Sequence, residues 1–304
     1  MNYNLITVLG PTATGKTSIA AQLAEDLNGE IISADSRQVY RGMNIGTGKD
    51  LDELIKRNIN YFLIDICEPN EEYNLFRFKE DFAAAFNLIS KKKKIPIMVG
   101  GTGMYISAVL QNYHLPPLED DTEEYKRLKK LTKDELLKLL LSLNPKLHNT
   151  TDLIFEERII RAIMIERSRN ETNVVNNNLT SLNIGIKPGR LIIKQNITNR
   201  LKVRLQSGMI EEVKMLIKKG IKIEKLKFFG LEYKYITQYV LGEINYNDMF
   251  QKLNSAIHNF SKRQLTWFSK MEKEGVKINW FNGNNYGEIL HFTKTELEKN
   301  YASS

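Results

Sequence analysis

The residues best suited to chemistry lie near the start of the chain, in the octet GPTATGKT at residues 10–17. This octet fits the pattern G-x-x-x-x-G-K-[ST], in which the glycines let successive backbone N–H groups turn toward one anion. Lys16 would reach the terminal phosphates, and the hydroxyl of Thr17 would ligate Mg²⁺. We therefore expect a phosphate-binding loop formed by Gly10, Pro11, Thr12, Ala13, Thr14, Gly15, Lys16 and Thr17.

Short apolar runs and helical stretches surround this loop. The β-rich run LITVL at 5–9 precedes it, and SIAAQLAEDLNG at 18–29 follows it with apolar residues at helical spacing. Further apolar runs at 30–33, 61–66 and 95–99 are separated by helical stretches. Short buried strands that alternate with helices favour an α/β fold. We expect a P-loop NTPase-like parallel sheet with helices on both faces.

Polar residues follow several of these runs, where a parallel sheet binds its ligands. Asp35 ends the second run and is a candidate general base. Asp65 lies in the third run, and it either ligates Mg²⁺ or simply caps the strand. Three residues after Asp35 could hydrogen-bond or stack with an acceptor: Ser36, Arg37 and Gln38.

The sequence texture changes after Pro116-Pro117, where apolar residues recur at helical spacing without a strand-like run. We predict a helical insertion at 113–189 between two parts of a catalytic core, 1–112 and 190–304. Within the insertion, the asparagine-rich stretch 170–183 has few core formers and is expected to form a mobile loop.

The second part of the core is predicted to complete the sheet. RLIIK at 190–194 is predicted to return to the sheet as a strand, and VKINWF at 276–281 to close it. Amphipathic helical segments separate the two runs, including a long one at 249–273.

Composition limits the class of protein. The 304 residues, 42% of them hydrophobic, suffice for a sizeable core, and the net charge of +8 suits a nucleic-acid partner without requiring one. The single cysteine, Cys67, excludes an internal disulfide and fits a reducing compartment. The apolar run near the N-terminus is too short for a signal or membrane helix. We expect a soluble cytoplasmic protein with no membrane partner.

A phosphate-binding loop does not define the reaction, because its fold serves kinases, ATPases and other transferases. A small-molecule kinase would use ATP and Asp35 as the base toward a hydroxyl. A non-catalytic, nucleotide-dependent RNA-binding factor is a further hypothesis.

Five motifs, in this order along the chain, favour a more specific hypothesis about the function: GPTATGKT, ISADSRQVYRGMNIGTGK, LIDICEP, PIMVGGTGMYISAVL and FSKRQLTWF. In order and spacing they resemble the tRNA dimethylallyltransferases (tRNA isopentenyltransferases). The resemblance implies transfer of a dimethylallyl group from dimethylallyl diphosphate to N6 of adenine 37, next to the anticodon in tRNA. The products would be N6-(dimethylallyl)adenosine and diphosphate. An adenylate isopentenyltransferase, which prenylates free nucleotides, is the related alternative.

The same resemblance assigns roles to residues. Asp35 would accept the proton of the adenine amine, Thr102 would orient that amine, and Mg²⁺ on Thr17 would stabilise the leaving diphosphate. Two residues would join the loop in binding diphosphate, namely Lys227 and Arg263. The tRNA would be bound by Asp35, Ser36, Arg37, Gln38, Glu157, Arg158, Arg161, Lys262 and Gln264. A monomer that holds the anticodon stem-loop with its insertion is expected.

Two positions depart from the family pattern. Glu157 stands where relatives carry a glutamine amide, and Lys227 stands where many carry an arginine. A lysine offers a compact ammonium instead of a bidentate fork. We expect the protein to keep its function with lysine at position 227. Trp267 is expected to belong to the hydrophobic core.

Overall fold

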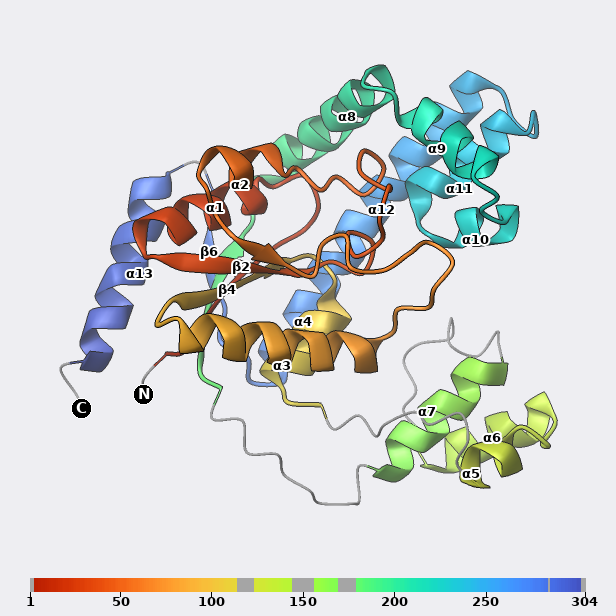
Figure 1. Cartoon of the computed structure of the whole chain (residues 1–304), viewed down its shortest axis with the longest axis horizontal. Helices are drawn as coiled ribbons and strands as arrows, with labels where there is room; N and C mark the ends of the chain where they lie inside the picture. Colours follow the sequence, from red (N-terminus) through yellow and green to blue (C-terminus); the bar gives the residue numbers. More distant parts are fainter. Residues whose placement is uncertain (1–2, 114–122, 144–155, 169–178, 284, 302–304) are drawn as a thin grey trace. The chain divides into compact units, whose positions relative to one another are not determined.

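The computed structural model describes the whole chain except residues 1–2, 114–122, 144–155, 169–178, 284 and 302–304. A six-stranded sheet has the strand order β3-β2-β4-β1-β5-β6, and every neighbouring pair is parallel. Figure 1 shows this sheet between its covering helices. The parallel α/β sheet predicted from the apolar runs is confirmed. The strands are β1 (Leu5–Leu9), β2 (Gly29–Ala34), β3 (Tyr61–Phe62), β4 (Ile95–Gly100), β5 (Ser181–Ile186) and β6 (Asn279–Phe281).

Helices cover both faces of the sheet, which explains why its strands are apolar on both sides. On β1, Leu5 and Leu9 pack into one hydrophobic cluster, whereas Ile6 and Val8 pack into another. The first cluster includes residues of α3 (Leu75–Lys91), α4 (Gly103–Leu110) and the second half of α12 (Tyr246–Lys273). The second includes residues of α1 (Lys16–Asp26), α2 (Asp52–Lys56) and α13 (Tyr286–Tyr301).

A further group of helices has its own hydrophobic core. Its members are α8 (Arg190–Gln206), α9 (Met209–Lys218), α10 (Ile223–Phe228), α11 (Leu231–Val240) and the first half of α12. Val39, Tyr40 and Met43, from the segment after β2, pack into this core together with Ala13 of the phosphate-binding loop. The helical group therefore supports the loops that follow β1 and β2.

The chain divides into two compact units, Met1–Gln111 with Leu179–Ser304, and Asn112–Asn178. The second unit holds α5 (Glu123–Leu128), α6 (Lys133–Leu143) and α7 (Glu156–Ser168) around a small core of its own. Thr132 and Glu135 form a capping box at the start of α6, since each side chain accepts a hydrogen bond from the other residue's backbone N–H.

One predicted strand is wrong. Residues 190–194 form the first turns of α8, because the buried positions Ile193, Ile197 and Leu201 recur every four residues. The chain returns to the sheet at β5, which begins inside the stretch predicted as a mobile loop. Residues 170–178 of that stretch lie outside the described residues.

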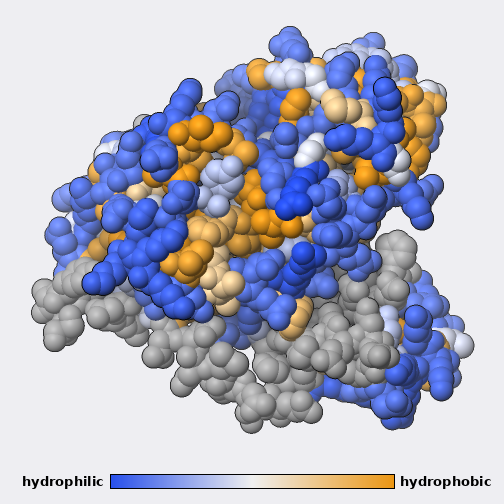
Figure 2. Space-filling view, in the orientation of Figure 1, coloured by the Kyte–Doolittle hydropathy of each residue, from blue (hydrophilic) through white to orange (hydrophobic). Residues whose placement is uncertain are grey.

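Figure 2 shows hydrophilic residues over most of the visible surface of the core unit, with hydrophobic residues reaching the surface between them. Scattered apolar side chains of this kind are normal for a folded protein. In the described part of the chain, no helix combines the length and apolar character needed to cross a membrane.

Candidate active site

The phosphate-binding loop follows β1 and leads into α1, as predicted. Gly15 has φ of 76° immediately before the helix. At Gly10 a Cβ atom would lie 2.4 Å from the carbonyl oxygen of Ile186, so only glycine lets the loop approach β5. The first turn of α1 contains no acidic residue. Its N–H groups and helix dipole are therefore suited to an anion.

Two arginines of α8 add positive charge to this loop. The guanidinium of Arg200 donates a hydrogen bond to the hydroxyl of Thr12. Arg204 passes so close to Gly48 that a Cβ atom there would lie 1.5 Å from its Nη2. Sequence reasoning missed both arginines, because their four-residue spacing in NRLKVRL marks only a basic helix face.

The cations are crowded together and removed from water. Burial, followed by the charge of Arg204, lowers the pKa of Arg200 to about 10. Burial, followed by the charge of Arg200, lowers the pKa of Lys16 to about 8. The ammonium of Lys16 donates to the carbonyl of Pro11 at 3.1 Å. A bound anion would offset the mutual repulsion of these cations, which adds to the effect of burial on both pKa values.

Glu232 of α11 partly balances the cations. Its carboxylate lies 3.8 Å from Arg204, and burial raises its pKa above the ordinary value for glutamic acid. A single carboxylate facing Arg204 and Arg200 offsets only part of their positive charge.

Asp35 and Thr102 lie beside each other at the carboxyl ends of β2 and β4. The register of these strands pairs Ala34, one residue before Asp35, with Gly100, two residues before Thr102. The backbone N–H of Ser36 donates to the Thr102 hydroxyl at 3.2 Å, and that of Arg37 donates to the Asp35 carboxylate at 2.9 Å. A carboxylate and a hydroxyl are thus held side by side at the sheet edge where the phosphate-binding loop follows β1.

Gln264 of α12 ties two loops of this edge together. Its Oε1 accepts a hydrogen bond from the backbone N–H of Thr12, and its Nε2 donates to the carbonyl of Gly101, both at 2.8 Å. The side chain is buried, with both ends of its amide engaged inside the protein. The resemblance implies that Gln264 binds tRNA, whereas in the structure its side chain is hydrogen-bonded to the phosphate-binding loop. Trp267 is partly buried in the core, as expected, and donates to Ser107 at 2.8 Å.

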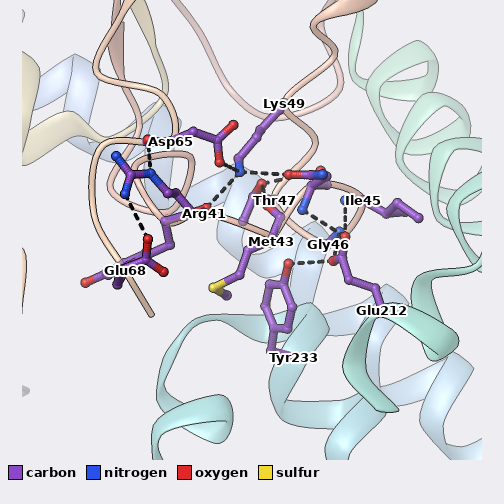
Figure 3. A network of polar contacts seen from close by, with 12 residues as sticks. Arg41, Met43, Ile45, Gly46, Thr47, Lys49, Asp65, Glu68, Glu212 and Tyr233 are labelled. Atoms are coloured by element: carbon purple, nitrogen blue, oxygen red, sulfur yellow. Dashed lines mark hydrogen bonds and ion pairs between the residues drawn. The ribbon is translucent and has the colours of Figure 1, made fainter. Parts of the chain in front are cut away.

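The segment between β2 and α2 is held from α9 and α11 (Figure 3). The carboxylate of Glu212 accepts hydrogen bonds from three successive N–H groups, those of Asn44, Ile45 and Gly46, at 2.7–3.0 Å. It also accepts one from the hydroxyl of Tyr233 at 2.7 Å. One buried carboxylate therefore fixes the turn in the middle of this segment.

Asp65 is not placed to act as a magnesium ligand beside the phosphate-binding loop. Its carboxylate pairs at 2.5 Å with Lys49, whose ammonium also donates to the carbonyl of Tyr40 and the side chain of Asn44 (Figure 3). Asp65 therefore fixes the segment after β2. Within the described parts of the chain, no group of three acidic, histidine or cysteine side chains could hold a metal.

Other predicted site residues have partners elsewhere. Gln38 accepts from Ser33 and donates to the carbonyl of Gly48, both at 2.9 Å. The ammonium of Lys227 pairs with Glu243 at 2.6 Å. Arg263 is exposed, with its guanidinium 5.9 Å from the ring centre of Phe260. These contacts do not direct the side chain of Lys227 or of Arg263 to the phosphate-binding loop.

A cavity of about 860 Å³ opens between α8 and α12. Four of its lining residues are basic: Lys187, Arg190, Lys194 and the predicted tRNA ligand Lys262. Burial, then the charges of Lys194 and Lys262, lower the pKa of His258 in its wall. The cavity is therefore positively charged. The three predicted tRNA ligands on α7, Glu157, Arg158 and Arg161, have side chains outside the described part of the structure.

The chain is similar to known proteins over most of its length. The family model described as IPP transferase matches residues 38–271, and one described as Isopentenyl transferase matches residues 3–67. A tRNA dimethylallyltransferase 1 of Azobacteroides pseudotrichonymphae is 49% identical over 302 residues, covering 95% of this chain and 98% of that protein. One of Geotalea uraniireducens is 49% identical over 286 residues, covering 93% and 94%.

The fold is similar to that of solved structures. The full-length tRNA isopentenylpyrophosphate transferase of Bacillus halodurans superposes with a TM-score of 0.73 at 28% identity, covering 98% of both chains. The corresponding protein of Staphylococcus epidermidis gives 0.71 at 31% identity, covering 97% of this chain and 99% of the other. A family model spanning most of the chain, together with near full-length relatives, places it in the IPP transferase family.

Proposed function

We propose that this protein transfers a dimethylallyl group from dimethylallyl diphosphate to N6 of adenine 37 in tRNA. The observation that carries the proposal is the joint placement of Asp35 and Thr102 at the sheet edge where the phosphate-binding loop follows β1. That loop supplies an anion site, and the carboxylate supplies a base. The relatives named above are described as tRNA dimethylallyltransferases.

The chemistry follows from these positions. The N6 nitrogen attacks the allylic carbon, so a carbon–nitrogen bond forms while the carbon–oxygen bond to diphosphate breaks. Asp35 accepts the proton that N6 loses, and the Thr102 hydroxyl orients the amine. No phosphoryl group moves in this reaction.

The leaving diphosphate gains negative charge as the carbon–oxygen bond breaks. The loop N–H groups, Lys16 and Arg200 stabilise that charge in place, which is how preorganised donors lower a barrier. Mg²⁺ held by the Thr17 hydroxyl would supply further positive charge when bound. One protein hydroxyl suits this ion, because Mg²⁺ takes most of its ligands from water and phosphate oxygens.

The tRNA requires a larger surface than the adenine alone. We assign the anticodon stem to the unit Asn112–Asn178, and phosphates near the anticodon loop to the basic cavity that includes Lys194 and Lys262. The target base must leave its stack to reach Asp35, which unpaired loops permit. The enzyme acts as a monomer in the cytoplasm on this proposal.

Incubation with radiolabelled dimethylallyl diphosphate and Mg²⁺ tests the proposal when unmodified tRNA, AMP and ATP are compared as partners. Label should enter tRNA. Label in AMP alone would indicate an adenylate isopentenyltransferase, and phosphate transfer from ATP without label in tRNA would indicate a kinase.

Asp35→Asn tests the base directly. It should lower kcat by about 10²- to 10⁴-fold without changing tRNA affinity, because the amide cannot accept the proton. The exposed Asp248→Asn, at the start of α12, is the matched control and should keep full activity. An unchanged rate in Asp35→Asn would remove Asp35 from the role of base.

A further inference from the structure

The exposed aromatic ring of Phe228 lies next to Arg37, the second residue after the candidate base Asp35. The guanidinium of Arg37 lies 5.6 Å from the ring centre of Phe228, the last residue of α10. The backbone N–H of Arg37 is bonded to the carboxylate of Asp35. Arg37 therefore links Phe228 to the place where the proton is removed.

Two adjacent phenylalanines at this turn have different environments. Phe229 is 1% exposed and packs edge-on against Tyr40 at a centroid distance of 4.7 Å, so it anchors the turn in the helical core. Phe228 is 53% exposed. An exposed phenylalanine is unremarkable by itself. Here, however, its position is fixed by Phe229 on the protein side and by Arg37 beside the site.

The backbone of the turn favours this arrangement. Gly230 has φ of 141°, and a Cβ atom there would lie 3.8 Å from Nε of Arg37. Arg37 therefore runs along the turn that joins α10 to α11, with Phe228 on one side of it. Lys225 on α10, whose ammonium donates to the backbone carbonyl of Glu71, adds a positive charge near this turn that suits a nucleic-acid backbone.

We propose that Phe228 is a stacking platform for the base next to adenine 37 in the tRNA anticodon loop. This inference rests on the proposed function and adds a residue that reads the neighbourhood of the target. Once adenine 37 leaves the stack toward Asp35, its neighbour loses a stacking partner. Unpaired bases of RNA regain such contacts on aromatic rings, and Phe228 offers an exposed ring beside Arg37.

The test measures equilibrium binding of a fluorescent anticodon stem-loop RNA by anisotropy, without dimethylallyl diphosphate. Phe228→Ala should raise the Kd for the intact RNA by about 5- to 100-fold, the usual effect of removing one aromatic stacking partner. Phe228→Trp should keep the wild-type Kd, because it retains a ring. Tyr246→Ala is the matched control, since Tyr246 is an aromatic residue of 45% exposure at the start of α12.

RNAs that lack one base identify the contact. Two stem-loops, each abasic on one side of adenine 37, are compared with the intact RNA. With one of them, Phe228→Ala should change the Kd less than 2-fold. An equal penalty on all three RNAs, or none on the intact RNA, would overturn the stacking role. Prenyl transfer by the wild-type protein is measured separately, so failure of the platform and failure of the proposed function are distinguishable.

Discussion

The side-chain oxygen of Gln264 accepts a hydrogen bond from the backbone N–H of Thr12 at 2.8 Å, although the two residues are 252 positions apart. The contact links the long helix α12 to the phosphate-binding loop. Because the other end of the same amide holds Gly101, the side chain sets the spacing between the loops that follow β1 and β4.

Gln264→Leu should weaken binding of dimethylallyl diphosphate about 10- to 100-fold. The substitution leaves the N–H of Thr12 and the carbonyl of Gly101 without their partner, a cost of about 1–3 kcal/mol for the ordered loop. Titration calorimetry with the diphosphate measures the change. Gln264→Glu is the informative comparison, since it keeps an acceptor for Thr12 but adds negative charge. It should bind diphosphate more weakly than Gln264→Leu, and tighter binding would contradict this role.

Glu212 accepts hydrogen bonds from three backbone N–H groups, so we expect it to contribute to the stability of the fold. Tyr233→Phe should lower the free energy of unfolding by about 1 kcal/mol, because one hydrogen bond is lost. Glu212→Ala should cost about 3–5 kcal/mol, because several buried groups lose their partner together. Urea unfolding measures both, and hydrogen exchange at residues 44–46 should accelerate in Glu212→Ala alone. Unchanged exchange there would show that the turn is fixed by other contacts.

Diphosphate binding should weaken as the pH rises through about 8. The charged form of Lys16 binds the anion, and its pKa of about 8 in the empty site means that it loses this charge above that pH. Dimethylallyl diphosphate is already ionised in this range, so the change belongs to the protein. Calorimetric Kd values between pH 6.5 and 9.5 should show the loss. Lys16→Arg should remove this loss of affinity at high pH. A loss that persists in Lys16→Arg would assign the titration to another group.

Glu30 should make the fold sensitive to acid at the end of the sheet opposite the site. Burial alone would raise its pKa, but hydrogen bonds from Asn60, Lys94 and Lys92 lower it to about 2. Since the folded pKa is depressed, this stabilisation is complete above the ordinary value of about 4.5 and is lost as the pH falls toward 2.

Glu30→Gln should therefore lower the free energy of unfolding by about 1–3 kcal/mol at pH 7, with a smaller difference at pH 3. Urea unfolding at the two pH values measures the effect. An equal difference at both would show that charge at Glu30 does not contribute. Lys92 and Lys94 both form ion pairs with this buried carboxylate.

Much of the site was predictable because its signals are local. The octet at 10–17 defines a loop by itself, and a parallel sheet places the carboxyl ends of neighbouring strands together, which brings Asp35 beside Thr102. The role of Arg200 depends on a contact 188 residues away, so no local pattern could reveal it. Asp65 matched the local pattern of a metal ligand, but its partner Lys49 can be recognised only once the chain is folded.

The wrong strand has a similar cause. The five residues RLIIK suit a strand or a helix equally well, because so short an apolar run carries no period. Only the continuation to Ile197 and Leu201 shows the four-residue repeat of a buried helix face.

The position of β1 between β4 and β5 has a consequence for synthesis on the ribosome. The partner on one side, β4, ends at Gly100, whereas the partner on the other side begins at Ser181, about 80 residues later. At about 5–20 residues per second, β1 is left as an open edge for about 4–16 s, and open edges invite mispairing. The length of the inserted helical unit thus sets how long the nascent sheet needs protection before β5 can close it.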